Sequence, residues 1–364
     1  MEPSILEDLE SNMTNLVSVI MPCYNASSYI DDLSWIFKQT YPNVEFVLVD
    51  DCSKDDTWQK LQEFKQKFPD KRIIVARNEH NMGPGPTRCH GTELSTGQFL
   101  CFWDADDYAE SNFIEKMLNK LEQEQADFAY CGHFRHFGDN NVKIVTVSPV
   151  LQSAPNLKAR QLLVKRFSCE PWCKLVRRSF IETNGIYFPE VFCGDDECWT
   201  FQLVLKAEKI AFIDEPLYHY RENVSNSVSK QVSDRFLNGI FNLFEFEYDF
   251  IGSQGLIKQN PDLLKVIEND VIDKFSWLRT KFKNDPLRLQ DTAYRYCDFC
   301  NRHNILLKTT EIPLIAAFRC YRLIPPFGKL KKARDHLKCR FYLYQDKRNR
   351  NELIKSIIKL AKHK

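Results

Sequence analysis

Four short apolar runs, each followed by a polar or acidic turn, constrain the fold more than any other feature of this sequence. Residues 17–22, 44–49, 72–76 and 98–103 are rich in β-branched and aromatic side chains, which predicts buried strands. Segments with the apolar spacing of amphipathic helices separate them. Strands and helices that alternate with short connections predict an α/β fold with a mostly parallel, doubly wound sheet, whose ligand site lies beyond the carboxyl ends of the strands.

Acidic residues directly follow two of the predicted strands. The fourth strand runs into Asp104-Ala105-Asp106-Asp107, and the second stops at Asp50-Asp51. Carboxylates two positions apart at a strand end suit Mg²⁺ or Mn²⁺, which also bridge phosphate oxygens. A solvated turn and a helix cap are the respective alternatives. Because the loop 22–25 ends a third strand, we expect all three groups to share one crevice.

Arg88 follows a loop rich in Gly and Pro on the same side of the predicted sheet, where its guanidinium can meet a diphosphate. A surface arginine is the alternative interpretation. The loop places Pro84 and Pro86 where a dinucleotide-binding turn needs backbone donors, and the sequence contains no phosphate-binding lysine loop. These features argue against hydride transfer and against kinase chemistry.

Several stretches also resemble a known family. In order they read VSVIMPCYNASSYI, VEFVLVDDCSKDDT, NEHNMGPGPTRCHGTELSTGQFLCFWDADD, WCKLVRRSF and GDDECWTFQLVLKAEKIAFIDEPLYHYR. They lie within residues 17–229, which resemble the family 2 glycosyltransferases with the GT-A fold, a Rossmann-like fold typified by bacterial enzymes that assemble lipopolysaccharide and capsule. Cys89-His90, Pro84, Pro86 and Asp195 depart from the family pattern, but no essential carboxylate is lost.

The resemblance implies roles for individual residues on the donor side. It places Pro22, Tyr24, Asn25 and Asp51 in the nucleotide pocket, with Asp51 as the reader of the nucleobase. Asp104 would touch the ribose or the metal, Asp106 would be the chief metal ligand, and Arg88 matches the arginine of the loop before the fourth strand. A Mn²⁺ or Mg²⁺ cofactor and a UDP-sugar donor follow from the same resemblance.

The resemblance also assigns the general base. The family's later acidic motif reads here Gly194-Asp195-Asp196-Glu197, and Asp196 matches the base. An inverting transfer needs one carboxylate that takes a proton from the acceptor hydroxyl while its oxygen attacks the anomeric carbon. Asp195 and Glu197 are expected to raise the pKa of Asp196 by like-charge repulsion. The alternative is an acidic helix start.

Further residues are expected on the acceptor side. Trp172 and Lys174 resemble the family's Trp-x-Lys segment, and His219 and Arg221 follow a strand that ends at the site. Asp195 is expected on the acceptor side as well. Aromatic faces stack on sugar rings, and Arg221 could reach a phosphate. Trp172 as a core residue and His219 as a structural residue are the alternatives.

Charge and composition divide the chain. Between Phe318 and Lys364 there are 15 Lys and Arg against three acids, although the whole chain has a net charge of +1. We expect a catalytic domain at 1–230 and a helical, basic region at 231–364 that contacts an anionic membrane or packs on the catalytic domain. An acidic start without an export pattern and 13 scattered cysteines predict a cytoplasmic location with reduced thiols. Nucleic acid is not an expected partner.

The predicted activity is transfer of a hexose or N-acetylhexosamine from a UDP-sugar to a growing surface glycan such as lipopolysaccharide or capsule. The acceptor would be an oligosaccharide or a lipid-linked glycan. A nucleotidyltransferase is one alternative, but the first strand is followed by PCYNASS and not by a Gly-rich basic loop. The other is a catalytically silent sugar-binding or scaffold protein of the same fold.

Overall fold

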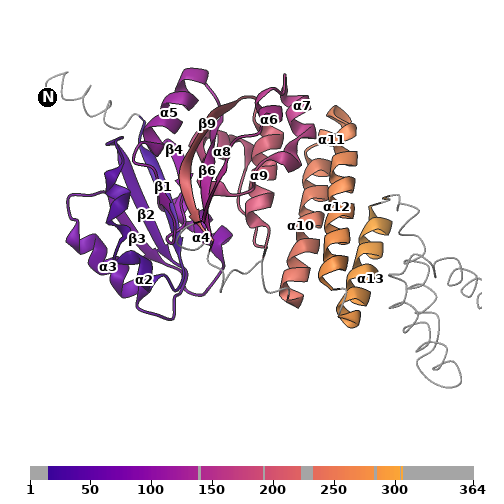
Figure 1. Cartoon of the computed structure of the whole chain (residues 1–364), viewed down its shortest axis with the longest axis horizontal. Coiled ribbons are helices and arrows are strands. Elements are labelled where there is room, and N and C mark those ends of the chain that lie inside the picture. The colour runs from indigo at the N-terminus through magenta and orange to yellow at the C-terminus, as the bar shows by residue number, and fades with distance from the viewer. Residues whose placement is uncertain are drawn as a thin grey trace, which may run out of the picture. The chain divides into compact units, whose positions relative to one another are not determined.

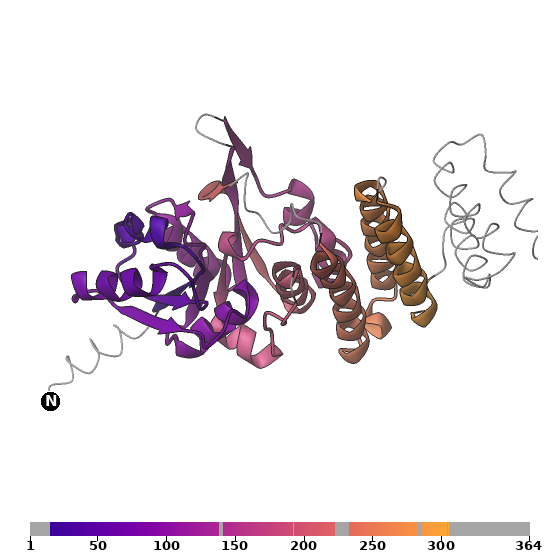
Figure 2. The same cartoon turned by 90° about the horizontal axis from the view of Figure 1, so that it is seen from below.

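The computed structural model describes residues 15–137, 141–191, 193–222, 233–282, 285–303 and 305. The chain divides into two compact units, Met1–Leu263 and Leu264–Lys364, which we describe separately. Figure 1 shows the strands in the first unit, and Figure 2 gives a second view of them. The predicted site therefore falls within the first unit.

A nine-stranded sheet forms the centre of the first unit. Its order is β3-β2-β1-β4-β8-β6-β9-β5, with β7 paired to β6. The strands are β1 (Val17–Cys23), β2 (Val44–Asp50), β3 (Ile73–Arg77), β4 (Phe99–Phe102), β5 (Tyr108–Ala109), β6 (Phe128–Phe137), β7 (Asn141–Val145), β8 (Lys174–Arg177) and β9 (Ile210–Arg221). The four predicted strands are thus β1 to β4, within one or two residues at each end.

The sheet is parallel in one half and mixed in the other. β1 pairs in parallel with β2 and with β4, and β2 pairs in parallel with β3, which confirms the doubly wound half. β8 then runs antiparallel between β4 and β6, and β6 pairs in parallel with β9. The carboxyl ends of β1, β2 and β4 meet at one edge because these neighbours share one direction.

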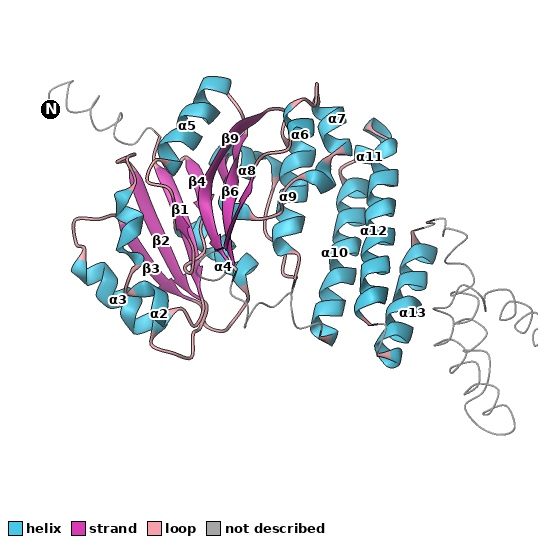
Figure 3. Ribbon diagram, in the orientation of Figure 1, coloured by secondary structure: helices cyan, strands magenta, loops and turns pink. Residues whose placement is uncertain are grey.

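Helices cover the sheet on both sides (Figure 3). All the helices of the first unit, including those that do not contact the sheet, are α2 (Ser27–Ile30), α3 (Thr57–Lys67), α4 (Pro84–Leu94), α5 (Phe113–Glu124), α6 (Pro149–Gln152), α7 (Leu157–Leu162), α8 (Arg178–Asn184), α9 (Asp195–Lys206), α10 (Asp234–Ser253) and α11 (Leu256–Gln259). Short 3₁₀ helices add η1 (Leu33–Lys38), η2 (Val164–Arg166) and η3 (Pro171–Cys173). Strands and helices alternate as predicted, and the fold class is α/β.

Helix α4 begins earlier than the sequence suggests. We expected a loop through Pro86, but Pro84 opens the helix, directly after Gly83 with φ +89°. Proline suits the first turn, because the amide hydrogen it lacks would have no partner within the helix and its fixed φ is already helical. At Gly91 a Cβ would lie 2.5 Å from Ile20 Cγ2, so this glycine lets α4 pack closely on β1. Pro84 and Pro86 therefore belong to the first turn of the helix that carries Arg88, and not to a loop before it.

The first unit extends beyond the predicted domain boundary. Residues after 230 form α10 and α11, and the unit ends at Leu263. The second unit contains α12 (Asp262–Lys281), which begins just before the division, and α13 (Pro286–Arg302). The basic stretch 318–364 and its predicted membrane contact lie outside the described residues. In the described part of the chain, no helix is both long enough and apolar enough to cross a bilayer.

Candidate functional site

The acidic groups predicted from separate strand ends surround the end of β1. Cys23, the last residue of that strand, is fully buried. Burial raises the pKa of its thiol, and the carboxylates of Asp50, Asp104 and Asp106 raise the pKa further. A thiol responds in this way only to charges that lie close to it. The ends of β1, β2 and β4 thus bring these carboxylates together at one edge of the sheet.

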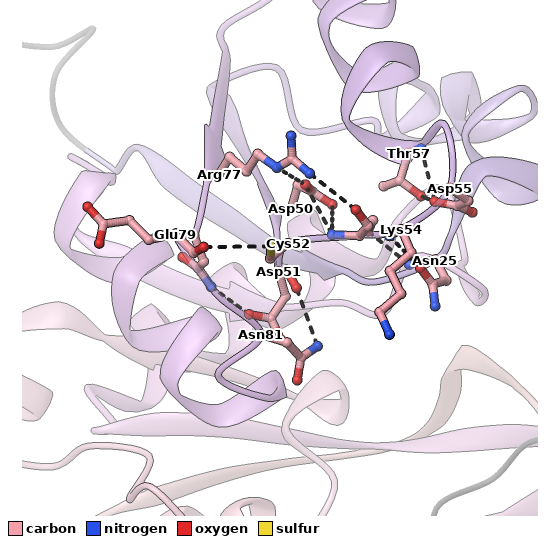
Figure 4. Close-up of polar contacts among 12 residues, drawn as sticks. Asn25, Asp50, Asp51, Cys52, Lys54, Asp55, Thr57, Arg77, Glu79 and Asn81 are labelled. Carbon is pink, nitrogen blue, oxygen red and sulfur yellow. Dashed lines mark hydrogen bonds and ion pairs between the residues drawn. The ribbon is translucent and has the colours of Figure 1, made fainter.

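Asp51 is buried and holds the loop that follows β3. Its carboxylate accepts hydrogen bonds from the Asn78 side chain at 2.8 Å and from the backbone N–H groups of Met82 at 2.9 Å and Gly83 at 2.8 Å. The Asn81 side chain donates to the Asp51 carbonyl at 3.3 Å (Figure 4). Asp51 therefore shapes the entry into α4, while its role as reader of the nucleobase stays a prediction.

Asp50, the neighbour of Asp51, has a different role. It is buried at the end of β2, where Arg77 Nε lies 2.9 Å from Asp50 Oδ2 and the Ser53 N–H donates at 3.1 Å (Figure 4). A buried carboxylate needs such partners, because an unpaired charge is costly away from water. Asp50 thus stabilises the turn after β2 and leaves Asp51 facing the loop 78–83.

The predicted nucleotide-side residues 22–25 lie beside this turn. Tyr24 is 45% exposed, and Pro22 is half-buried. Asn25 has a φ of +50°, its side chain accepts the Lys54 N–H at 2.9 Å, and its own N–H donates to Ser53 Oγ at 2.9 Å. This loop is therefore braced against the turn after β2 and leaves one aromatic ring open to a ligand.

The acidic turn after β4 presents three carboxylates. Asp104 and Asp106 are half-buried, whereas Asp107 is buried. Burial raises the pKa of Asp107, and the charges of Asp104 and Asp106 raise it further. Asp107 Oδ1 accepts the Arg221 N–H at 2.7 Å, but no residue of the described part hydrogen-bonds its Oδ2.

These carboxylates fit a hard divalent cation. Their oxygens are the ligands that Mg²⁺ and Mn²⁺ prefer, and a cation would lower the repulsion that raises the pKa of Asp107. The Asp104 N–H donates to the Tyr218 hydroxyl at 3.0 Å, which ties the turn to β9. Asp104 and Asp106 are the two carboxylates of this turn that are partly exposed to solvent, so they are the candidates to hold an ion.

Arg88 joins the acidic turn to the predicted base. Its side chain is only 4% exposed, and its Nη2 lies 2.9 Å from Asp104 Oδ1. Its Nη1 lies 2.7 Å from Asp196 Oδ1 and 3.4 Å from Asp195 Oδ2. Residues from α4, β4 and α9 thus meet at one guanidinium. The structure places Arg88 as the partner of carboxylates, and a contact with a diphosphate stays a prediction.

Asp195 and Asp196 open α9 directly after Gly194, which has a φ of +87°. Removal from water raises the pKa of Asp196 to about 8; Arg88 opposes this shift, while Asp195, Asp104 and Glu170 add to it. Burial also raises the pKa of Asp195, although the positive charge of Arg88 opposes this shift. A carboxylate with a pKa near the working pH is suited to take a proton from a hydroxyl.

Gly85 was not among the predicted residues, yet it allows α4 and α9 to meet. A Cβ at this position would lie 2.8 Å from Asp195 Oδ2. Glycine is therefore required for the close approach that lets Arg88 reach the acidic start of α9. Its place in the Gly-Pro run was the available signal, but the partner helix lies more than a hundred residues further along the chain.

The predicted acceptor-side residues Trp172 and Lys174 are buried. The Trp172 ring stacks on Tyr218 with 4.6 Å between ring centroids and lies 5.7 Å from Tyr220. Lys174 Nζ donates to the carbonyls of Ser168 at 2.8 Å and Glu170 at 2.6 Å. Both side chains pack inside the protein against β9 and the segment 168–170. Any direct contact with an acceptor stays a prediction.

His219 and Arg221 lie on the opposite face of β9 from Tyr218, because neighbouring positions of a strand alternate. His219 Nε2 lies 2.8 Å from Glu110 Oε1, and its Nδ1 lies 3.0 Å from His136 Nε2. Burial lowers the pKa of His219, which keeps the ring neutral at pH 7. Arg221 is exposed and lies over the Tyr108 ring.

Comparison with known sequences finds similarity to glycosyltransferases. Residues 18–185 match the sequence model described as Glycosyl transferase family 2. EpsH of Bacillus subtilis, named as a glycosyltransferase, is 29% identical over 86% of this chain and 93% of its own length. TarS of Staphylococcus aureus, a poly(ribitol-phosphate) β-N-acetylglucosaminyltransferase, is 31% identical over 56% of this chain but only 35% of its own length.

Comparison with solved structures supports the fold. TarS 1–349 of S. aureus in complex with UDP-GlcNAc superposes with a TM-score of 0.62 and 19% identity, covering 90% of this chain and 89% of that one. A second crystal structure of S. aureus TarS 1–349 gives a TM-score of 0.59 at 20% identity, covering 90% of this chain and 89% of that one. At this level of identity the likeness concerns the arrangement of strands and helices only.

Proposed function

We propose that this chain, which matches the glycosyl transferase family 2 model over residues 18–185 and has the GT-A fold, is an inverting glycosyltransferase. In this proposal it moves a sugar from a UDP-sugar to a hydroxyl of a growing surface glycan. The observation that supports this proposal most strongly is the junction at Arg88, which holds Asp196 at 2.7 Å and Asp104 at 2.9 Å. It brings a candidate base beside the acidic turn that faces the leaving group.

Asp196 takes the proton of the acceptor hydroxyl in this proposal. The acceptor oxygen attacks the anomeric carbon as the bond to the nucleoside diphosphate breaks on the opposite side, and the electron pair of that bond leaves with the diphosphate. General-base assistance of this kind contributes about 10²–10⁴-fold to a rate. Arg88 fixes the position of Asp196 through a charge-assisted hydrogen bond, which pairs the buried guanidinium at the same time.

Asp104 and Asp106 are the residues that would hold a Mn²⁺ or Mg²⁺ ion. A bound divalent cation supplies charge neutralisation for the departing diphosphate. Asp107, buried behind them and bonded to the Arg221 backbone, supports the turn from within. Which of the two metals the protein prefers is a question for titration.

The donor proposal rests on the nucleotide side of the site and on the relatives. Tyr24 offers an exposed aromatic face beside Asp51, and the TarS structure holds UDP-GlcNAc. We propose UDP-linked hexoses or N-acetylhexosamines as donors, and an oligosaccharide or lipid-linked glycan of the lipopolysaccharide or capsule type as acceptor. A cytoplasmic location and membrane contact through the basic stretch 318–364 remain part of this proposal.

A thermal-shift panel tests the donor. A ligand that binds only the folded protein raises its apparent stability by an amount that depends on concentration and affinity. We expect UDP and UDP-sugars to raise the melting temperature in the presence of Mn²⁺, and GDP-mannose and CMP-sialic acid to leave it unchanged. A shift by GDP or CMP compounds alone would overturn the choice of donor. No shift by any nucleotide would favour a silent scaffold protein.

A further inference from the structure

A second carboxylate, that of Glu170, belongs to a segment that contacts the first turns of α9. Glu170 is half-buried and directly precedes η3. Thr200 Oγ1, which lies one turn after Asp196 on α9, donates to the carbonyl of the preceding residue Cys169 at 2.7 Å. In keeping with this contact, the charge of Glu170 acts to raise the pKa values of Asp196 and His133. The His133 ring packs edge-on against Trp172, with 4.7 Å between ring centroids. Glu170 therefore lies in the short segment that connects the contact with α9 to Trp172.

Hydrogen bonds hold the backbone of residues 168–170, which includes Glu170. Three successive carbonyls are bonded from inside the molecule, because Lys174 Nζ donates to Ser168 and Glu170, while Thr200 Oγ1 of α9 donates to Cys169 at 2.7 Å. Burying an ammonium group is costly unless hydrogen bonds satisfy it, and Lys174 is fully buried. The lysine of the predicted Trp-x-Lys segment thus holds the backbone of residues 168–170 in place.

The side chain of Glu170 is positioned as well. Ser168 Oγ donates a hydrogen bond to the Glu170 carboxylate. A carboxylate has about four acceptor positions on its two oxygens, so one such bond leaves capacity for a ligand. Asp195, Asp196 and Glu170 together make this side of the site acidic, which disfavours an acceptor with a negative charge at the reacting ring.

We propose that Glu170 determines acceptor specificity by accepting a hydrogen bond from the hydroxyl next to the one that Asp196 deprotonates. The acceptor class is then a neutral sugar or polyol with two adjacent hydroxyls. Trp172 and Lys174 are positioning residues that act through Glu170. This inference rests on the proposed glycosyl transfer, since it concerns the second substrate of that reaction.

The test combines Glu170→Gln with deoxy acceptors. The panel contains ribitol and the octyl β-glycosides of glucose, galactose and N-acetylglucosamine, each assayed at pH 9 so that Asp196 is largely ionised in every variant. We expect Glu170→Gln to raise the acceptor KM by about 10–100-fold, as for loss of a hydrogen bond to a charged group. UDP-sugar affinity and hydrolysis of UDP-sugar by water stay within twofold. Removing the neighbouring hydroxyl from the acceptor raises the acceptor KM of the wild type but not that of Glu170→Gln.

Glu208→Gln, an exposed glutamate, is the matched control and leaves all these quantities unchanged. An unchanged acceptor KM in Glu170→Gln, or a fall in water hydrolysis as large as the fall in transfer, overturns the inference and leaves the proposed function standing. Transfer by the wild type to none of the panel refutes the acceptor class. If the wild type neither binds nor hydrolyses a UDP-sugar, the proposed function fails first and this inference fails with it.

Discussion

Arg88 Nη1 lies 2.7 Å from Asp196 Oδ1, across more than a hundred residues of sequence. The same guanidinium reaches Asp104 on the far side at 2.9 Å, so one cation organises two carboxylates to which the family assigns separate tasks. The Arg88 side chain is only 4% exposed, whereas that of Asp196 is 33% exposed, so a buried guanidinium holds a carboxylate that solvent can still reach. The predictions below depend on that junction.

Replacement of Arg88 by Met is expected to be strongly destabilising. The change leaves Asp104, Asp195 and Asp196 without their shared cation, and removing one partner of a buried ion pair costs about 3–5 kcal/mol. Chemical unfolding followed by circular dichroism measures the effect. Lys116→Met is the control, because its exposed pair with Glu215 is worth about 0–1 kcal/mol. Equal effects of the two changes would refute the junction.

The pH dependence of transfer should report the raised pKa of Asp196. A base works only when ionised, so with a pKa of about 8 the value of kcat/KM falls as the pH drops below 8, tenfold per unit well below it. Asp195→Asn removes a charge that raises this pKa, and it should move the midpoint to lower pH. A profile that is flat between pH 6 and 9 would argue against Asp196 as the base in this environment.

Gly85→Ala is expected to separate α4 from α9. The new methyl group would lie 2.8 Å from Asp195 Oδ2, and an overpacked contact of this kind costs about 1–3 kcal/mol. Transfer activity should fall with stability, since Arg88 is three residues along the same helix. Gly252→Ala is the matched control: no atom lies within 4 Å of its added Cβ, so it should be neutral or stabilising by up to about 1 kcal/mol.

Asp106→Asn should weaken nucleotide binding only where a metal takes part. We expect the affinity for UDP in the presence of Mn²⁺ to fall by at least about tenfold, or 1.4 kcal/mol, in calorimetric titration. EDTA should reduce the wild type to the level of the variant. Asp214→Asn, an exposed position on β9, serves as control. Equal UDP affinity of wild type and Asp106→Asn, with and without Mn²⁺, would contradict the metal assignment.

The sequence predicted the elements that local patterns encode. Strands β1, β2 and β4 are apolar runs that stop at polar turns, so both their positions and their meeting at one sheet edge followed from periodicity and chain direction. The mixed half of the sheet was not predictable in the same way. β8 has only four residues and lies between strands from distant parts of the chain, so its direction depends on tertiary pairing.

Side-chain roles were harder to predict than positions. Arg88 was expected to meet a diphosphate because it follows the Gly-Pro loop, and Lys174 was expected on the acceptor side because it resembles the lysine of the family's Trp-x-Lys segment. Both are buried and bonded to the protein itself. Sequence spacing carries no information on burial at a strand start such as Lys174, or on a partner that lies more than a hundred residues away. The role of Gly85, for example, follows only from its close approach to Asp195.

The most direct test of the central claim compares wild type and Asp196→Asn in two assays with the UDP-sugar selected by thermal shift. One assay measures release of UDP in the presence of the preferred acceptor, and the other measures UDP binding by calorimetry. We predict a rate lowered by about 10²–10⁴-fold and a UDP affinity within a factor of two. Release of UDP and formation of glycoside at wild-type rates by Asp196→Asn would contradict the account.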